Sequence, residues 1–245
     1  MEHVVQQGQT LFEIAKLFNT SIVDICQVNN IKDSNVIKVN QILIIPNSLN
    51  NNNLKEKINK FINFIESKKI QKSISFTAKS SIELIFNKCI EFGITDLRMI
   101  SYILATTHWE TGAYGQRFIY EPVPEQGKGK GKPYGIPHKK SGKIYYGRGF
   151  VQITWFDNYE RFTKILNKLG YNVDLVNNPD LALKPEIAAL ILIIGMKDGK
   201  FTGRDLSDYF TPTKSDYYNA RKIINGLDKA VIIADIAKEI HYIIK

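Results

Sequence analysis

A short asparagine-rich run divides this 245-residue sequence into two unequal parts. Residues 47–53 read NSLNNNN, a polar segment of low complexity, so we expect a flexible linker there. The total length suits a small domain followed by a medium-sized one, with enough chain to bury a substantial core. We therefore place one domain at residues 1–47 and another at residues 54–245, with the linker over 48–53.

The first part has the pattern of a complete βααβ module. A short strand at residues 4–5 and a closing strand at residues 41–46 enclose two runs with apolar residues at helical spacing, 11–18 and 22–28. Hydroxyl residues before each run are typical helix caps, and Asn29-Asn30 would end the second helix.

This module resembles a LysM domain in the runs GQTLFEIAKLFNTS, ICQVNNI and VNQILIIP. The resemblance implies a shallow groove for polymers of N-acetylglucosamine, formed by the loop after the first strand and the loop before the last. That groove would involve Gly8, Gln9, Thr10, Leu11, Asn29, Asn30 and Ile31. The same residues are also suited to turns and helix caps, so a purely structural role stays open.

The second part contains two glutamates close to the end of an apolar helical run. Residues 99–104 lead to Glu110, and Thr111-Gly112 should end the helix. Half shielding by the core raises the pKa of such a carboxyl and keeps the proton that a general acid donates. Glu121 follows after a loop and can face Glu110 across a cleft, which is the arrangement that glycosidic hydrolysis needs. Glu125 is close enough in sequence to be the second carboxylate instead.

The run YYGRGFVQITWFDNY at residues 145–159 supplies further polar groups. If a helix begins near Trp155, Thr154 and Asn158 share one face, where they could hold a water molecule and an acetamido group. Gly147 and Gly149 have no Cβ, so the backbone and a substrate could approach closely there.

Residues 79–245 resemble the family 19 glycoside hydrolases, which are the plant-type chitinases and related bacteriophage endolysins. The resemblance lies in the runs HWETG at residues 108–112, YYGRGFVQITWFDNY, FTGRDLSDYF and RKIING. The resemblance implies a mainly α, lysozyme-like helical domain and an inverting mechanism with Glu110 as acid, Glu121 as base and Thr154 holding the water. It implies substrate binding by Tyr146, Arg148, Gln152, Asn158 and Asn225. Relatives usually have His directly before the acidic Glu. His108 and Trp109 are exchanged here, so the role of that His is not carried over.

Helical spacing recurs along the rest of the second part, with glycines between the segments. We expect helices at residues 54–65, 80–92, 95–110, 159–169, 185–196, 215–224 and 229–244. The isoleucine stripe of the last segment is expected to pack in the core, because acidic residues share that helix and lysines are not concentrated on its polar face.

Positive charge is concentrated after the linker. The whole chain has a formal net charge of +9, whereas residues 1–53 hold three Lys and four acidic residues. Residues 127–143, GKGKGKPYGIPHKKSGK, contain six Lys and no acid, which predicts a mobile loop at the rim of the cleft. Such a loop is either simply solvated or in contact with an anionic substrate. No nucleic-acid-binding signature is found, so we expect no nucleic-acid partner.

Other features exclude several classes of protein. Cys26 and Cys89 fall in different parts, so no disulfide framework is expected, and His and Cys spacing predicts no metal. No cofactor is expected. The chain has no signal-peptide pattern, and its longest apolar run is too short to span a bilayer, so we expect no stable membrane insertion.

The patterns together predict a monomeric endolysin-type hydrolase that cleaves β-1,4 bonds of bacterial peptidoglycan. It would stay in the host cytoplasm until lysis and then act on the cell wall. Three alternatives stay open: a chitinase, a non-catalytic glycan-binding protein on a hydrolase fold, and a lytic transglycosylase in which Glu121 is dispensable.

Overall fold

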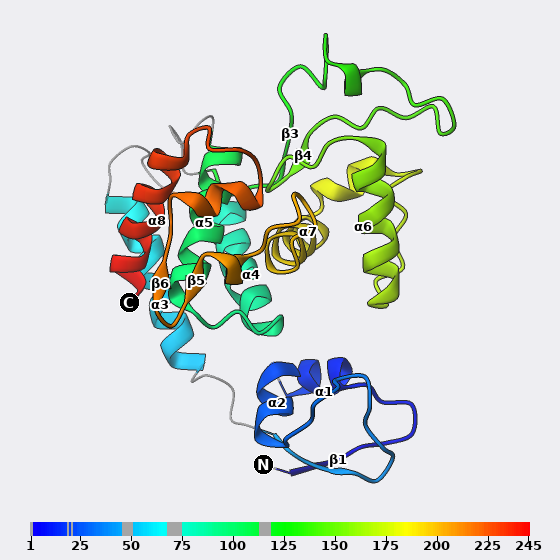
Figure 1. The fold of residues 1–245 in the computed structure, drawn as a ribbon, viewed down its shortest axis with the longest axis vertical. Helices are drawn as coiled ribbons and strands as arrows, with labels where there is room; N and C mark the ends of the chain where they lie inside the picture. The colour runs from blue at the N-terminus through cyan, green and yellow to red at the C-terminus, as the bar shows by residue number, and fades with distance from the viewer. Residues whose placement is uncertain (1, 19, 21, 46–50, 68–74, 113–118) are drawn as a thin grey trace.

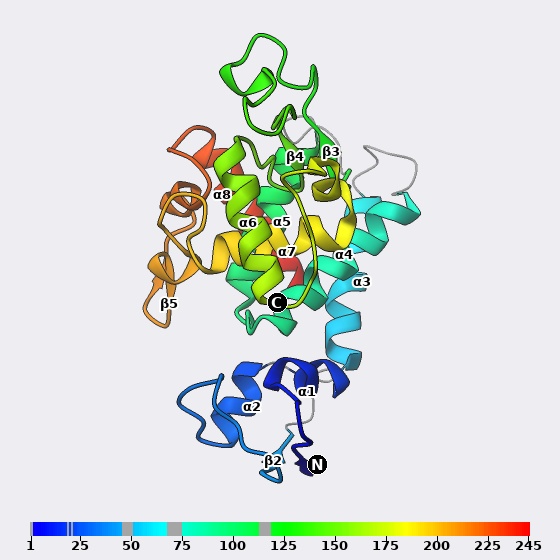
Figure 2. The ribbon, with the colours of Figure 1, turned by 90° about the vertical axis from the view of Figure 1, so that its right-hand side faces the viewer.

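The computed structural model describes residues 2–18, 20, 22–45, 51–67, 75–112 and 119–245 (Figure 1). Two separate hydrophobic cores organise these residues, one within residues 5–45 and the other within residues 58–244. Both views show the first unit as a lobe at one end of helix α3, Asn51–Ser67 (Figure 2). The rings of Phe12 and Tyr171 meet edge to face between the two units, with centroids 6.1 Å apart.

The first unit has the expected βααβ order. Strand β1, Glu2–Val4, pairs antiparallel with β2, Ile42–Ile44, and helices α1, Leu11–Leu17, and α2, Ile22–Val28, lie between them in the chain. Thr10 caps α1 by accepting the amide of Glu13, while the Glu13 carboxylate accepts the amide of Thr10. This capping box explains where α1 begins.

The last three residues of the expected linker belong to a helix. Helix α3 begins at Asn51, so residues 51–53 are helical, and residues 46–50 lie outside the described part of the chain. Apolar side chains then recur along one face of α3, where Ile58, Phe61 and Ile65 are buried. Burial of this stripe outweighs the low helix propensity of the asparagines.

The second unit is mainly α-helical. Helix α5, Leu97–Thr111, packs along α8, Ala230–Ile244, while α4, Phe76–Glu91, packs against α7, Pro185–Lys197. Helix α7 is buried on every side from Ile187 to Met196, as expected for a helix that is apolar all round. Helix α6, Phe156–Lys168, is amphipathic and covers one side.

Among the described residues of this unit, strands form two short pairs. Strand β3, Val123–Pro124, pairs with β4, Arg148–Gly149, and β5, Phe210–Thr211, pairs with β6, Lys214–Ser215. The described part of the chain also contains four short 3-10 helices: η1, Pro133–Gly135; η2, Pro179–Leu183; η3, Leu206–Asp208; and η4, Asn219–Ile223.

The expected α-helix at residues 215–224 is wrong. Residues 214–215 are a strand, and only the short η4 follows. The Asp216 carboxylate accepts the backbone amide of Asn219 at 3.0 Å, and the Asp216 amide donates to the Tyr209 carbonyl. These local bonds give the backbone an alternative to an α-helical turn.

The C-terminal isoleucine stripe packs largely as expected, with Ile233 and Ile240 buried in the core, whereas Ile232 is exposed. Among the described helices, none has the length and apolar character needed to cross a membrane. Cys26 and Cys89 are free thiols, and complete burial raises the pKa of the Cys89 thiol.

Candidate active site

Glu110 lies in the last turn of helix α5, whose C-cap is Gly112. The guanidinium of Arg221 in η4 donates to Glu110 Oε1 at 2.9 Å, and the side chains of Arg221 and Glu110 are 5% and 17% exposed, respectively. The Nε of Arg221 donates to the carbonyl of Asp228. The carboxyl of Glu110 and the guanidinium of Arg221 are therefore held together, with both side chains largely shielded from solvent.

Burial raises the pKa of Glu110, and the charge and hydrogen bond of Arg221 oppose this rise without cancelling it. A carboxyl with a raised pKa keeps its proton in a wider range of pH, which a general acid requires. Sequence reasoning missed Arg221, although the run RKIING that contains it was part of the family resemblance. The signal was present, but only the fold brings Arg221 to Glu110.

Glu121 follows a residue that is anchored in the core. Tyr120 is fully buried, with the ring of Phe61 edge-on at 5.8 Å and the ring of His108 stacked at 5.7 Å. Tyr120 has a φ of 45°, a conformation that is uncommon for a non-glycine residue. Because His108 belongs to α5, this stacking ties the segment of Glu121 to the helix that carries Glu110.

A hydroxyl at the start of α4 also contacts Glu121. Ser75 donates to Glu121 Oε1, while its own oxygen accepts the amide of Ala78 and so caps the helix. Glu121 is half-buried. Residues 113–118, which connect it to α5, lie outside the described residues.

Glu125 has a different environment, on the wall formed by β3 and β4. Its Oε1 accepts from the hydroxyl of Tyr134 at 2.8 Å, and its Oε2 accepts from the amide of Gly147 at 3.0 Å. Burial and the Glu125 carboxylate raise the pKa of Tyr134 to about 12. Both oxygens of Glu125 are thus used to hold the neighbouring loop and strand.

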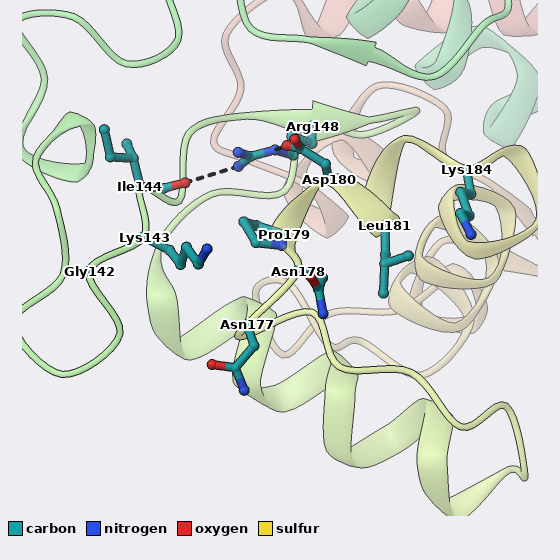
Figure 3. A pocket seen from close by; sticks show the side chains of 10 residues that line it. All are labelled: Gly142, Lys143, Ile144, Arg148, Asn177, Asn178, Pro179, Asp180, Leu181 and Lys184. Carbon is teal, nitrogen blue, oxygen red and sulfur yellow. Dashed lines mark hydrogen bonds and ion pairs between the residues drawn. The ribbon is translucent and has the colours of Figure 1, made fainter.

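Arg148 is buried within the protein. Its guanidinium donates to Asp180 at 2.7 Å and to the carbonyl of Ile144 (Figure 3). It also donates to the carbonyl of Tyr146 and faces the Tyr146 ring at 3.5 Å. Tyr159 completes this set as a further acceptor. These contacts give Arg148 and Tyr146 a role in the fold, and their expected contact with substrate stays a prediction.

The two glycines beside Arg148 are needed for close contacts within the protein. A Cβ on Gly147 would lie 2.8 Å from Oε1 of Gln152, and one on Gly149 would lie 2.8 Å from the carbonyl oxygen of Ala182. Gly149 also has a φ of +85°. These glycines therefore allow close packing within the protein, and the expected approach of a substrate to their backbone stays a prediction.

Gln152 and Thr154 lie just before helix α6, and Asn158 lies in its first turn. Helix α6 begins directly after Trp155, and the Asn158 amide donates to the Thr154 carbonyl at 2.9 Å. The Gln152 amide donates to the carbonyls of Val123 and Gly149, which joins this turn to both strands. Thr154 and Asn158 are half-buried. Thr154 precedes the helix, and the expected shared face of the two side chains stays a prediction.

Asn225 is exposed four residues after Arg221, and its amide donates to the Arg221 carbonyl at 3.0 Å. Its side-chain oxygen accepts the amide of Gly226. Asn225 therefore borders the pair of Glu110 and Arg221, and its expected contact with substrate stays a prediction.

The lysine-rich loop, residues 127–143, is attached to its surroundings by aromatic side chains. His138 stacks on Phe156 at 3.9 Å, and Tyr134 meets Trp155 edge to face at 5.4 Å. Its six lysines are exposed. The loop projects beyond β3 and β4, away from α8 (Figure 1). We expected a mobile loop, and the sequence did not predict these two aromatic contacts, which attach the loop to the start of α6.

The residues expected to bind glycan in the first unit all have internal structural roles. Gly8 and Asn30 have positive φ, and the Gln9 side chain accepts the amide of Gln6. Asn29 joins the end of α2 to β2 through both atoms of its amide, at 2.7 Å to the Ile44 backbone. Thr10 is the cap of α1, Leu11 is buried, and Ile31 packs against the core. Glycan binding by these residues stays a prediction.

Within the described ranges, no group of three or more His, Cys, Asp or Glu side chains could hold a metal ion. The polar groups described at the site are carboxyls, a guanidinium, hydroxyls and amides. This set is suited to proton transfer and to the recognition of polar, hydroxyl-rich ligands.

Comparison with known proteins identifies the first unit. The LysM domain model matches residues 3–46. The N-acetylmuramoyl-L-alanine amidase XlyA of Bacillus subtilis (strain 168) is 44% identical over 43 residues, which are 18% of this chain and 14% of that protein.

Endochitinase A2 of Pisum sativum is 36% identical over 99 residues, 35% of this chain and 29% of that protein. The chain thus spans less than a third of the length of either curated relative. Chitinase C from Streptomyces griseus HUT6037 aligns with 79% of this chain and 75% of its own, at 16% identity and a TM-score of 0.40. A mutant of chitinase C aligns with 93% of each chain at a TM-score of 0.39. Residues 3–46 are a LysM domain, and they are joined to a mainly α-helical unit that is similar in part to chitinases.

Proposed function

We propose that this protein is an endolysin-type glycoside hydrolase that cleaves β-1,4 bonds between N-acetylated amino sugars of bacterial peptidoglycan. The observation that carries the proposal is Glu110, a half-buried carboxyl with a raised pKa at the end of α5, held by Arg221. The second unit also contains Glu121, Thr154 and Asn158, and the chain begins with a LysM domain. A glycan-binding module beside a site suited to acid catalysis supports a glycan-cleaving enzyme.

In the proposed mechanism, Glu110 donates its proton to the leaving glycosidic oxygen. Glu121 accepts a proton from a water molecule that attacks the opposite face of the sugar, so the anomeric configuration is inverted. Thr154 helps to hold this water, and Asn158 binds the substrate with Gln152. Arg221 orients Glu110 and stabilises the carboxylate that remains after proton transfer.

The contacts of the two candidate bases favour Glu121 over Glu125. Both oxygens of Glu125 accept hydrogen bonds from the protein, from Tyr134 and Gly147. Among the described residues, Glu121 accepts a side-chain hydrogen bond only from Ser75, on one oxygen. A general base needs a free lone pair within reach of the water, and Glu121 has one available.

Two features support peptidoglycan as the substrate. The B. subtilis relative of the LysM domain is named for an activity on N-acetylmuramoyl-L-alanine, and the positive charge lies in the second unit, where the exposed lysines of residues 127–143 suit a polymer with carboxylates. The pea relative of the second unit is an endochitinase, which favours chitin as a second candidate. An endolysin would wait in the host cytoplasm and reach the wall at lysis.

A direct competition tests the proposal: equal amounts of enzyme on purified peptidoglycan and on chitin oligomers, at low and high salt, with mass spectrometry of the products. We expect faster cleavage of peptidoglycan, and we expect salt to slow it. Faster cleavage of chitin would make the protein a chitinase. Anhydro sugar ends would indicate a lytic transglycosylase, and a folded chain that binds but does not cleave would be a binding protein.

The role of the LysM domain is tested with a chain that begins at Asn51, the first residue of α3. We expect this chain to keep its activity on soluble fragments and to bind whole walls at least tenfold more weakly, because tethering raises the effective concentration of the second site. Equal wall binding by both chains would remove the targeting role.

A further inference from the structure

We propose that the hollow between residues 142–144 and residues 177–184 binds a carboxylate group on the peptide part of peptidoglycan, through the ammonium groups of Lys143 and Lys184. This site is separate from Glu110 and its partner Arg221. The inference rests on the proposed function, because it takes peptidoglycan as the ligand.

The hollow has a volume of about 560 Å³ and is open to solvent on one side. Lys143 comes from the end of the lysine-rich loop, and Lys184 directly precedes helix α7. In Figure 3 these two lysines lie on opposite sides, with the side chains of Asn177 and Asn178 between them. The size suits a short peptide or one sugar unit.

The charges around the hollow leave two cations without partners. The buried Arg148 forms an ion pair with the exposed Asp180 at 2.7 Å, so these two charges neutralise each other. Lys143 and Lys184 form no ion pair with any residue that the structure describes, in contrast to Lys88, which pairs with both Glu91 and Glu186. The lining therefore has an excess positive charge of about two, which attracts an anion.

The rest of the lysine-rich loop strengthens this field. Its other five lysines are also exposed and unpaired among the described residues, and the contact of His138 with Phe156 fixes the loop next to α6. Charges on a fixed loop need less ordering when an anion binds, and they raise the rate of encounter with a polyanion.

The apolar part of the lining indicates which anion fits. Ile144, Pro179 and Leu181 contribute aliphatic surface, and the two asparagines contribute amide groups. An aliphatic amino acid with a free carboxylate uses all three kinds of contact: the lysines bind its charge, the amides bind its peptide groups, and the apolar residues bind its side chain. A stem peptide of peptidoglycan has these features, whereas chitin has no carboxylate.

The test measures binding with the full chain in a Glu110→Gln background, so that no substrate is cleaved. The probes are a soluble disaccharide–tetrapeptide fragment of peptidoglycan and the same fragment with its carboxyl groups amidated. We expect the parent chain to bind the free-acid fragment about fivefold more tightly, since two partly exposed charge pairs contribute modestly. Lys143→Gln/Lys184→Gln should lose this preference and leave the binding of the amidated fragment unchanged.

The matched control is Lys55→Gln/Lys238→Gln, which removes the same charge from helices α3 and α8. It should keep the preference, and circular dichroism should show that all variants are folded. Equal binding of the two probes by the parent chain, or an equal loss in the control, would overturn the site. Carboxylate-dependent binding in a parent enzyme that cleaves no peptidoglycan would leave the site standing and remove the proposed function.

Discussion

Glu110 and Glu125 are both half-buried glutamates of the second unit, but they differ in how many of their carboxylate oxygens accept hydrogen bonds from the protein. Glu110 is held by one oxygen to Arg221, and its pKa is raised by burial. Glu125 uses both oxygens to hold Tyr134 and Gly147. Glu121 resembles Glu110 in this respect, because its described side-chain partner, Ser75, occupies one oxygen. The comparison teaches that the number of occupied lone pairs, and not burial alone, separates a candidate for catalysis from a structural carboxylate.

The largest expected effect is that of Glu110→Gln. The amide has the same shape but no proton to donate, so we expect hydrolysis to fall by a hundredfold or more, to about 10⁻² to 10⁻⁴ of the parent rate. Product release from peptidoglycan or chitin measures this, with the melting temperature as the control for folding. A folded variant that keeps most of its activity would show that Glu110 is not the acid.

The next largest effects are expected from Glu121→Gln and Glu125→Gln, whose reaction rates and stabilities are compared. Loss of the base should reduce the rate about a hundredfold in the first variant, with little change in stability. The second should mainly lower the free energy of unfolding, by about 1–3 kcal/mol, because the Tyr134 hydroxyl and the Gly147 amide lose a charged acceptor. Rates and denaturant unfolding of both variants decide between them, and the reverse result would make Glu125 the base.

Arg221→Met should change the pH dependence of the reaction. Arg221 favours the ionised form of Glu110, so its removal should raise the pKa of Glu110 further and move the alkaline limb of the rate profile to higher pH. The rate should fall at the same time, since the acid is no longer oriented. Arg221→Lys should move the limb less, because a cation stays in place. A lower rate with an unmoved limb would limit Arg221 to a structural role.

Ser75→Ala should have the smallest effect. It removes the hydroxyl that donates to Glu121 and the cap of α4, so we expect a several-fold lower kcat and a loss of about 1 kcal/mol in the free energy of unfolding. Ser75→Thr keeps the hydroxyl and should restore both. If Ser75→Ala loses stability without losing kcat, the contact with Glu121 does not position the base.

Much of this organisation could be predicted from the chain alone. Apolar spacing placed α5, α7 and α8, and hydroxyl caps placed α1, because both signals are local and repeat at the period of the helix. The βααβ order of residues 2–45 followed in the same way, and the HWETG run placed Glu110 at a helix end.

Only the tertiary structure decided which groups are available for chemistry. Arg221 contacts Glu110 although the two residues are 111 positions apart in the chain. Arg148 binds Asp180, and Gln152 and Ala182 pack closely against Gly147 and Gly149, respectively. The anchoring of the lysine-rich loop on Phe156 and the hollow between Lys143 and Lys184 likewise depend on segments that are distant in the chain. Sequence periodicity reports which face of an element is buried, whereas the partner of a polar atom depends on how separate elements pack, and no local pattern records that.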